Sequence, residues 1–216
     1  MLWFLLLVSH NGNCFQGLSY GDGSVSGKEY LDTITLNSDL VIKVQSIGVA
    51  DNGDDAGLRG DLDGILGVGP IDLTEGTVNN TYEVPTVMDN LYAQHSINSE
   101  VLGVFFAPAS ATDTTGELTF GNYDISKITG DINYVPITLT YPANNYWGID
   151  QSISYGLTSI LRETAGIVDT GTTLILIAAG MSPRVCQRKS THTSLKMPSK
   201  NIKLRQVPPL IPLLAC

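Results

Sequence analysis

The sequence predicts an all-β protein, mainly strands with one or two short helices, and three observations carry this prediction. From Gly17 onward the apolar residues fall into short alternating runs, as in strands exposed on one face. Gly, Asp, Asn and Pro separate these runs, as turn residues do. Charged residues make up only 15% of the 216 residues, which favours a turn-rich β architecture over a helical bundle.

Two neighbouring runs predict a β-hairpin. Residues 29–36 and 40–49 both alternate apolar and polar side chains, and an Asn-Ser-Asp turn joins them. Further runs with strand composition lie at residues 102–106, 117–120, 134–140, 147–155 and 166–177.

One segment, residues 85–95, has the pattern of a helix. Pro85 and Thr86 are residue types that commonly begin helices. An apolar stripe at helical spacing follows, formed by Val87, Met88, Leu91 and Tyr92.

Charge divides the sequence into an acidic body and a basic end. All 21 Asp and Glu residues lie before residue 181, beside only five of the 12 Lys and Arg, so the body carries a net charge of about −16. This argues against nucleic acid or an anionic membrane as a partner, and it suits an enzyme that works in acid. We expect residues 181–216, which hold the other seven basic residues, to lie outside the folded protein; alternatively, they bind an acidic surface such as the body.

Three local features bear on targeting. Cys14 lies before Gly17, and Cys186 and Cys216 lie after residue 180, so no disulfide framework is predicted. The apolar run at residues 1–8 lacks a basic start and a clean cleavage site, so no signal peptide is predicted, and it is too short to span a membrane. Asn79-Asn80-Thr81 is a sequon, which makes Asn79 a candidate N-glycosylation site if the chain enters the secretory pathway.

One motif, Ala165-Gly-Ile-Val-Asp-Thr-Gly-Thr-Thr-Leu174, has the chemistry of a positioned carboxylate. Two β-branched residues lead into Asp169, and Gly171 permits a sharp turn. The hydroxyls of Thr172 and Thr173 can bond to the carboxylate and fix its orientation. A plain turn is the alternative for the bare tripeptide, but the flanking residues favour a carboxylate at the end of a buried strand.

Two glycine-rich motifs precede it. Ser19-Tyr-Gly-Asp-Gly-Ser-Val-Ser-Gly27 places Tyr20 at the shoulder of a hairpin tip, and it lacks the lysine and following helix of a phosphate-binding loop. Leu62-Asp-Gly-Ile-Leu-Gly-Val-Gly-Pro70 suggests a buried strand end where two backbones pass closely. Taken singly, each also fits a purely structural role.

Together, in this order and spacing, the motifs resemble the pepsin family of aspartic endopeptidases (peptidase family A1). The resemblance includes Gly116-Glu-Leu-Thr-Phe-Gly121 and Tyr146-Trp-Gly-Ile149, and it covers about three quarters of the chain. Residues 45–50 and 151–156 are most similar to secreted fungal enzymes of the polyporopepsin type. The resemblance implies a bilobal β fold with a cleft for a peptide or protein substrate, secretion, and no metal or other cofactor.

The resemblance also implies a role for each matching residue. Asp169 corresponds to the catalytic aspartate of the second lobe, Tyr20 to the tyrosine of the flap, and Ile65 to a residue of the pocket before the scissile bond. The residues implied in substrate binding are Tyr20, Gly21, Asp22, Ser24, Ile65, Gly171, Thr172 and Thr173.

The chain departs from the family pattern in two places. A first Asp-Thr-Gly should lie well before the flap, yet only 19 residues precede Tyr20, and the triplets at Asp32 and Asp113 lack the glycine. The resemblance also stops near residue 180, before the Ile-Leu-Gly segment of the second lobe. We therefore expect a fold incomplete in both lobes. Its predicted parts are a non-matching segment 1–16, a first lobe 17–126 without its first catalytic strand, the start of a second lobe 127–180, and an unfolded tail 181–216.

Three interpretations of function remain open. The chain is a truncated aspartic endopeptidase that is inactive alone, a homodimeric protease with one Asp169 per chain, or a non-catalytic peptide-binding module. The two half-lobes are not matched for a two-fold site, which weighs against the dimer. Strands without partners leave backbone groups that cost about 1–3 kcal/mol each when buried, which weighs against the module.

Overall fold

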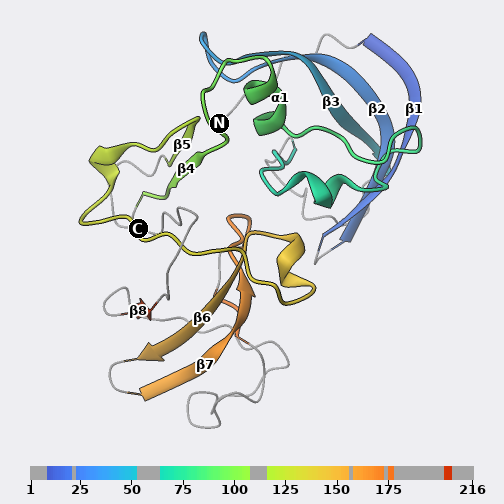
Figure 1. Cartoon of the computed structure of the whole chain (residues 1–216). Helices are drawn as coiled ribbons and strands as arrows, with labels where there is room; N and C mark the ends of the chain where they lie inside the picture. The colour runs from blue at the N-terminus through green and yellow to red at the C-terminus, as the bar shows by residue number, and fades with distance from the viewer. Residues whose placement is uncertain are drawn as a thin grey trace. The chain divides into compact units, whose positions relative to one another are not determined.

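The computed structural model describes residues 9–20, 23–52, 64–107, 116–155, 158–172, 175–177 and 202–205. Across these residues the chain is mainly β, as predicted, with a single α-helix (Figure 1). They form two compact units that divide between Thr129 and Gly130. The lobe limits expected from the motifs stay a prediction.

An antiparallel sheet of three strands in consecutive order dominates the first unit (Figure 1). Its strands are β1 (Ser9–Tyr20), β2 (Gly23–Thr35) and β3 (Val41–Asn52). The predicted hairpin is confirmed, because β2 and β3 pair from Ser26↔Asn52 to Thr35↔Val41. Asn37 closes its turn: the side-chain Oδ1 accepts hydrogen bonds from the backbone N–H groups of Asp39 and Leu40, both at 2.9 Å.

The predicted helix is confirmed as α1 (Val87–Ala93), shorter at both ends than its pattern. Thr86 begins it with a capping box: its Oγ1 accepts from the Asp89 N–H at 3.3 Å, and Asp89 Oδ2 accepts from the Thr86 N–H at 2.7 Å. Val87 and Leu91 are buried, whereas Tyr92 is 45% exposed and does not belong to the buried face.

The hydrophobic core of this unit joins α1 to the β2–β3 hairpin. Its buried members are Ile34, Ile42, Val87, Leu91 and Ile97. A buried amide links the same elements: Gln45 Nε2 donates to the Pro85 carbonyl at 3.2 Å, and its Oε1 accepts from Asn90 Nδ2 at 2.9 Å. The core therefore buries a polar group whose hydrogen bonds are made, which avoids a desolvation penalty.

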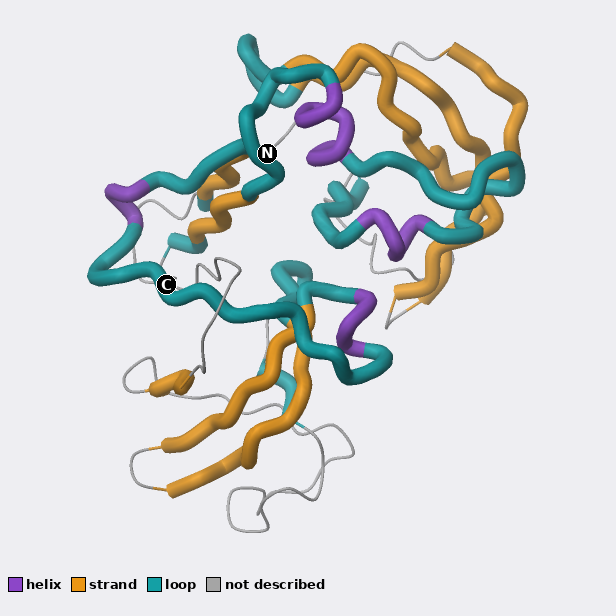
Figure 2. The backbone as a smooth tube through the Cα atoms, in the orientation of Figure 1, coloured by secondary structure: helices purple, strands orange, loops and turns teal. Residues whose placement is uncertain are grey.

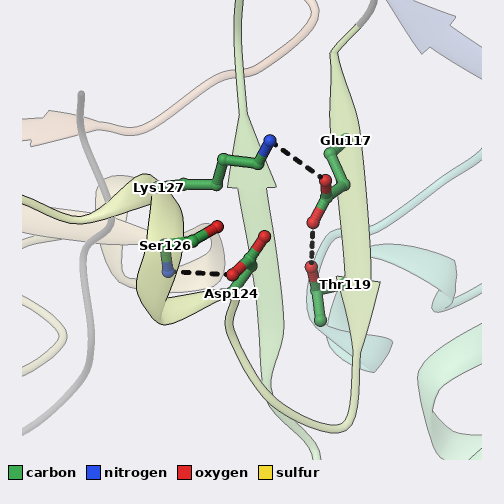
Figure 3. Close-up of polar contacts among 5 residues, drawn as sticks. All are labelled: Glu117, Thr119, Asp124, Ser126 and Lys127. Atoms are coloured by element: carbon green, nitrogen blue, oxygen red, sulfur yellow. Dashed lines mark hydrogen bonds and ion pairs between the residues drawn. The ribbon is translucent and has the colours of Figure 1, made fainter.

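A two-stranded hairpin, β4 (Leu102–Phe105) with β5 (Glu117–Phe120), lies where two strands are predicted. Lys127 joins it to the segment that follows: its Nζ lies 3.6 Å from Glu117 Oε2 (Figure 3). The same Nζ lies 4.9 Å from the centre of the Phe105 ring. Thr119 Oγ1 donates to the other oxygen of Glu117 at 3.1 Å.

The second unit has a sheet with the strand order β7-β6-β8, and the tube in Figure 2 shows that the described segment before β6 is mostly loop. Its strands are β6 (Gly148–Tyr155), β7 (Thr158–Ile167) and β8 (Ile202–Arg205). Ile153, Ile160 and Leu161 form its core, with Ile177 packed against them. Three short 3-10 helices complete the described elements: η1 (Ile71–Thr74), η2 (Ile125–Lys127) and η3 (Ala143–Asn145).

Two predicted strands are wrong. Residues 134–140 have only an isolated bridge at Tyr134, although the run has strand composition. The strand predicted at 166–177 instead ends at Ile167 as the close of β7, and a turn follows at residues 170 and 171. β8 lies within residues 181–216, for which no folded structure is expected; the other residues of that segment lie outside the described part of the chain.

Asp124 begins η2, and its Oδ1 accepts a hydrogen bond from the Ser126 N–H at 2.9 Å (Figure 3). Hydrogen bonds from the side chain and backbone of Ser126 lower the pKa of Asp124 below its ordinary value of 3.8. A lowered pKa means that the contact stabilises the fold above pH 3.8 and that this contribution is lost as the pH falls through the lowered pKa.

We expect Ser126→Ala to raise the pKa of Asp124 toward 3.8, because the largest cause of the shift is removed. Titration of the Asp124 carboxyl carbon by NMR measures this change. Ser38→Ala, at an exposed turn in the β2–β3 hairpin, serves as the matched control. An unchanged Asp124 pKa in the Ser126 variant would contradict the assignment.

Candidate active site

Asp169 lies two residues after β7, in a turn that holds its own side chain. The Gly171 N–H donates to Asp169 Oδ1 at 2.9 Å, and Thr172 Oγ1 donates to Oδ2 at 2.5 Å. Both carboxylate oxygens are thus bonded within three residues of the chain, and the bond from Thr172 is the one expected from the motif. The expected buried strand end is wrong, because Ile167 at the end of β7 is 45% exposed. The carboxylate is exposed, and the two local donors fix its plane.

The turn begins at a well-anchored point. β6 and β7 pair up to Gly148↔Ile167, and the next residue, Val168, donates its N–H to the Trp147 carbonyl at 2.9 Å. Gly148 is buried against the Ala143 carbonyl, which leaves no room for a Cβ. Trp147 therefore supports the aspartate turn through its backbone, a role that its place in a family motif did not reveal.

A buried threonine braces the same region. Thr138 Oγ1 donates to Asp150 Oδ1 at 2.8 Å, and the Thr138 N–H donates to the Gly148 carbonyl at 2.9 Å. The composition of residues 134–140 predicts a strand and does not reveal this contact. The only available signal was two threonines, Thr138 and Thr140, in an otherwise apolar run, and this signal does not specify a partner.

The glycine-rich motif around Tyr20 forms a hairpin tip in the first unit. Tyr20 ends β1 and Gly23 begins β2, and the two residues pair, as do Ser19 and Ser24. Tyr20 therefore lies at the shoulder of the hairpin, as predicted. Gly21 and Asp22 lie outside the described residues, and for Tyr20 and Ser24 the structure describes the backbone alone.

The segment around Ile65 differs from its prediction. Ile65 is 52% exposed, and residues 64–68 form no regular strand. A Cβ added at Gly64 or Gly67 would meet no atom within 4 Å, so the predicted close approach of two backbones is wrong. The reason is physical: a buried strand end needs a partner strand, and no described strand pairs with this segment.

The structure thus brings together Asp169, Gly171 and Thr172 in the second unit, and it places Tyr20, Ser24 and Ile65 in the first. Thr173 lies outside the described residues. Among the described residues, no second carboxylate hydrogen-bonds to Asp169. Within the same residues, no three His, Cys, Asp or Glu side chains are grouped to bind a metal ion, and no helix is long and apolar enough to cross a membrane.

A family model and several individual proteins match most of this chain. A family model described as "Eukaryotic aspartyl protease" matches residues 8–200. The chain is 58% identical to polyporopepsin from Irpex lacteus over 166 residues, which cover 75% of this chain and 48% of that protein. It is 34% identical to rhizopuspepsin-1 from Rhizopus niveus over 172 residues, 79% of this chain and 42% of that protein.

Among solved structures, the aspartic proteinase from Irpex lacteus matches with a TM-score of 0.74 at 54% sequence identity. The match covers 81% of this chain and 51% of that one, so the chain spans about half the length of the relatives it matches. The mainly β fold class is confirmed. Because the family model covers well over half of the sequence, the chain belongs to the pepsin-like family of eukaryotic aspartyl proteases.

Proposed function

We propose that this chain carries one half of the catalytic apparatus of an aspartic endopeptidase. Asp169 is one of the two carboxylates that act on a peptide or protein substrate, and the hairpin tip at residues 20–24 is the flap that covers it. The observation that carries the proposal is the aspartate turn: Gly171 and Thr172 hold both oxygens of an exposed carboxylate in a fixed plane.

The turn suits a group that must take a proton from water. An ionised carboxylate has about four lone-pair sites, and the two local donors occupy two of them. The remaining sites can accept hydrogen bonds from a water molecule. Asp169 then acts as a base toward that water, whose oxygen attacks the carbonyl carbon of the peptide bond.

One carboxylate does not complete this chemistry. The tetrahedral product of the attack needs a proton donor, and in a two-carboxylate site like charges keep one partner protonated for that task. The only Asp-Thr-Gly of the sequence is at residue 169. We therefore expect this chain to hydrolyse no peptide alone.

The remaining site residues follow from the same proposal. Tyr20, Gly21, Asp22 and Ser24 contact the substrate from the flap, and Ile65 contributes to the pocket before the scissile bond. The half-exposed side chain of Ile65 supports a role in contact rather than in a core. Gly171, Thr172 and Thr173 contact the substrate on the aspartate side.

The negative charge of residues 1–180 supports catalysis at acid pH, in a secretory compartment or outside the cell. Its 21 carboxylates face few basic residues, so they repel one another at neutral pH. Asp and Glu have ordinary pKa values near 4, so protonation below about pH 5 relieves this repulsion. We expect catalysis to be fastest on this side of neutrality.

A joined protein tests the proposal. It carries this chain's matched region, completed at both ends with the segments of the Irpex lacteus aspartic proteinase that the match does not cover. We expect the joined protein to cleave a fluorogenic peptide at acid pH, whereas the chain alone releases no product above background.

Other outcomes separate the alternatives. A folded joined protein without activity would contradict the proposal. Activity of the chain alone that is lost in Asp169→Asn would favour a homodimeric protease. If a thermal melt of the chain alone shows no cooperative transition, the chain has no stable fold. This result would exclude a peptide-binding module.

A further inference from the structure

The loop between η1 and α1 presents an asparagine at its tip. Gly76 and Tyr82 close the loop, with the Gly76 N–H donating to the Tyr82 carbonyl at 3.0 Å. Val78 is buried and anchors one side of the tip. Asn79 and Asn80 form the turn that follows, and both are exposed. The tip is therefore held in place while its two amide side chains face solvent.

The base of the loop is tied down by threonine side chains. Thr74 Oγ1 accepts from the Val84 N–H at 2.8 Å and donates to the Ile71 carbonyl at 2.7 Å. Thr77 Oγ1 donates to the Thr74 carbonyl at 2.7 Å. A bulky group on Asn79 would thus extend from the loop without disturbing the contacts that shape it.

Other asparagines of the first unit use their side chains to build the fold. Asn37 caps the turn of the β2–β3 hairpin, Asn90 bonds to Gln45, and Asn122 Oδ1 accepts from the Tyr123 N–H at 2.9 Å. Among the described residues, by contrast, Asn79 makes no side-chain hydrogen bond. Modification of its amide therefore removes no contact from the described structure.

Asn79 also begins the one Asn-X-Ser/Thr triplet in the sequence. Thr81, two residues on, is exposed and lies at the edge of the same loop. Its Oγ1 donates to the Glu83 carbonyl at 2.8 Å, so its lone pairs stay open to a donor. The sequon thus lies in an exposed turn rather than in a strand or a helix.

We propose that Asn79 carries an N-linked glycan. The donor is an oligosaccharide linked through a pyrophosphate to a lipid. Asn79 Nδ2 forms a bond to the anomeric carbon of the first sugar, and the bond from that carbon to the pyrophosphate oxygen breaks. Nδ2 loses one proton, and the lipid pyrophosphate leaves with the electron pair. No oxidant or reductant is consumed.

The test expresses the full chain in yeast behind a cleavable secretion leader. Loss of the leader, read by N-terminal sequencing, shows that the chain entered the secretory lumen. We expect a slower-migrating form that peptide N-glycosidase F converts to the unmodified form, with Asp found at position 79 by mass spectrometry. Glycan transfer acts on the entering chain, so variants that fold poorly still report the result.

Matched variants make the test specific. Asn79→Gln and Thr81→Ala should abolish the shift, because one removes the acceptor and the other the hydroxyl. Thr81→Ser keeps the hydroxyl and should retain the shift, and Asn80→Gln, next to the acceptor, should leave it unchanged. A chain whose leader is removed but which shows no shift overturns the proposal, as does a shift that persists in Asn79→Gln.

Discussion

Replacing Asp169 with Asn in the joined protein is expected to lower kcat by about 10²–10⁴-fold, the usual contribution of a general acid or base. The amide has the same size and can still accept the hydrogen bond from the Gly171 N–H through its oxygen. It cannot take a proton from water at acid pH. The loss therefore falls on kcat, while KM changes little because the loop keeps its shape.

The control for this prediction is the same substitution at Asp131, an exposed residue of the same unit. Asp131→Asn removes one negative charge without touching the aspartate turn, so its kcat should stay within about twofold of the parent. Steady-state kinetics at several acid pH values measure both variants. Equal rates for Asp169→Asn and the parent would show that another carboxylate supplies the base.

Local chemistry explains the parts of the fold that were predictable. The Asn-Ser-Asp turn specifies the hairpin because Asn37 Oδ1 accepts hydrogen bonds from the backbone N–H groups two and three residues later. Thr86, followed three residues later by Asp89, specifies the start of α1 through a capping box. In both cases the residues that decide the structure lie within four positions of one another, so a sequence pattern contains the whole interaction.

The missed elements depend on partners far along the chain. Residues 134–140 have strand composition, but Val135 and Thr138 are buried while Leu139 is 96% exposed, so the burial does not alternate as in a strand. The Thr138 N–H bonds to Gly148, ten residues away, instead of to a strand ladder. β propensity describes a pleated, half-buried surface and does not supply the neighbouring strand.

The same division applies to the candidate site. The Asp169 turn could be predicted because Gly171 and Thr172, its two donors, belong to the motif itself. The environment of Ile65 could not, since a closely packed strand end requires a second backbone that the motif does not encode. The hydrogen bonds of Asp169 are therefore specified by neighbouring residues of the motif. The burial of Ile65, in contrast, depends on pairing with a strand outside the motif.

Leu91→Ala is expected to lower the free energy of unfolding of the chain by about 2–5 kcal/mol, the usual cost of deleting a buried leucine side chain. Leu91 is fully buried in the cluster that joins α1 to Ile34 and Ile42. α1 has only seven residues, too few for a stable helix in isolation, so packing of this face holds it in place.

Tyr92→Ala is the matched control, because the neighbouring side chain on the same helix is half-exposed. Its cost should be near that of a surface substitution, about 0.5 kcal/mol. Urea unfolding followed by far-UV circular dichroism measures both variants. Since a typical domain has a margin of only about 5–15 kcal/mol, Leu91→Ala should shift the midpoint strongly. Equal midpoints for the two variants would mean that α1 does not pack against Ile34 and Ile42 as described.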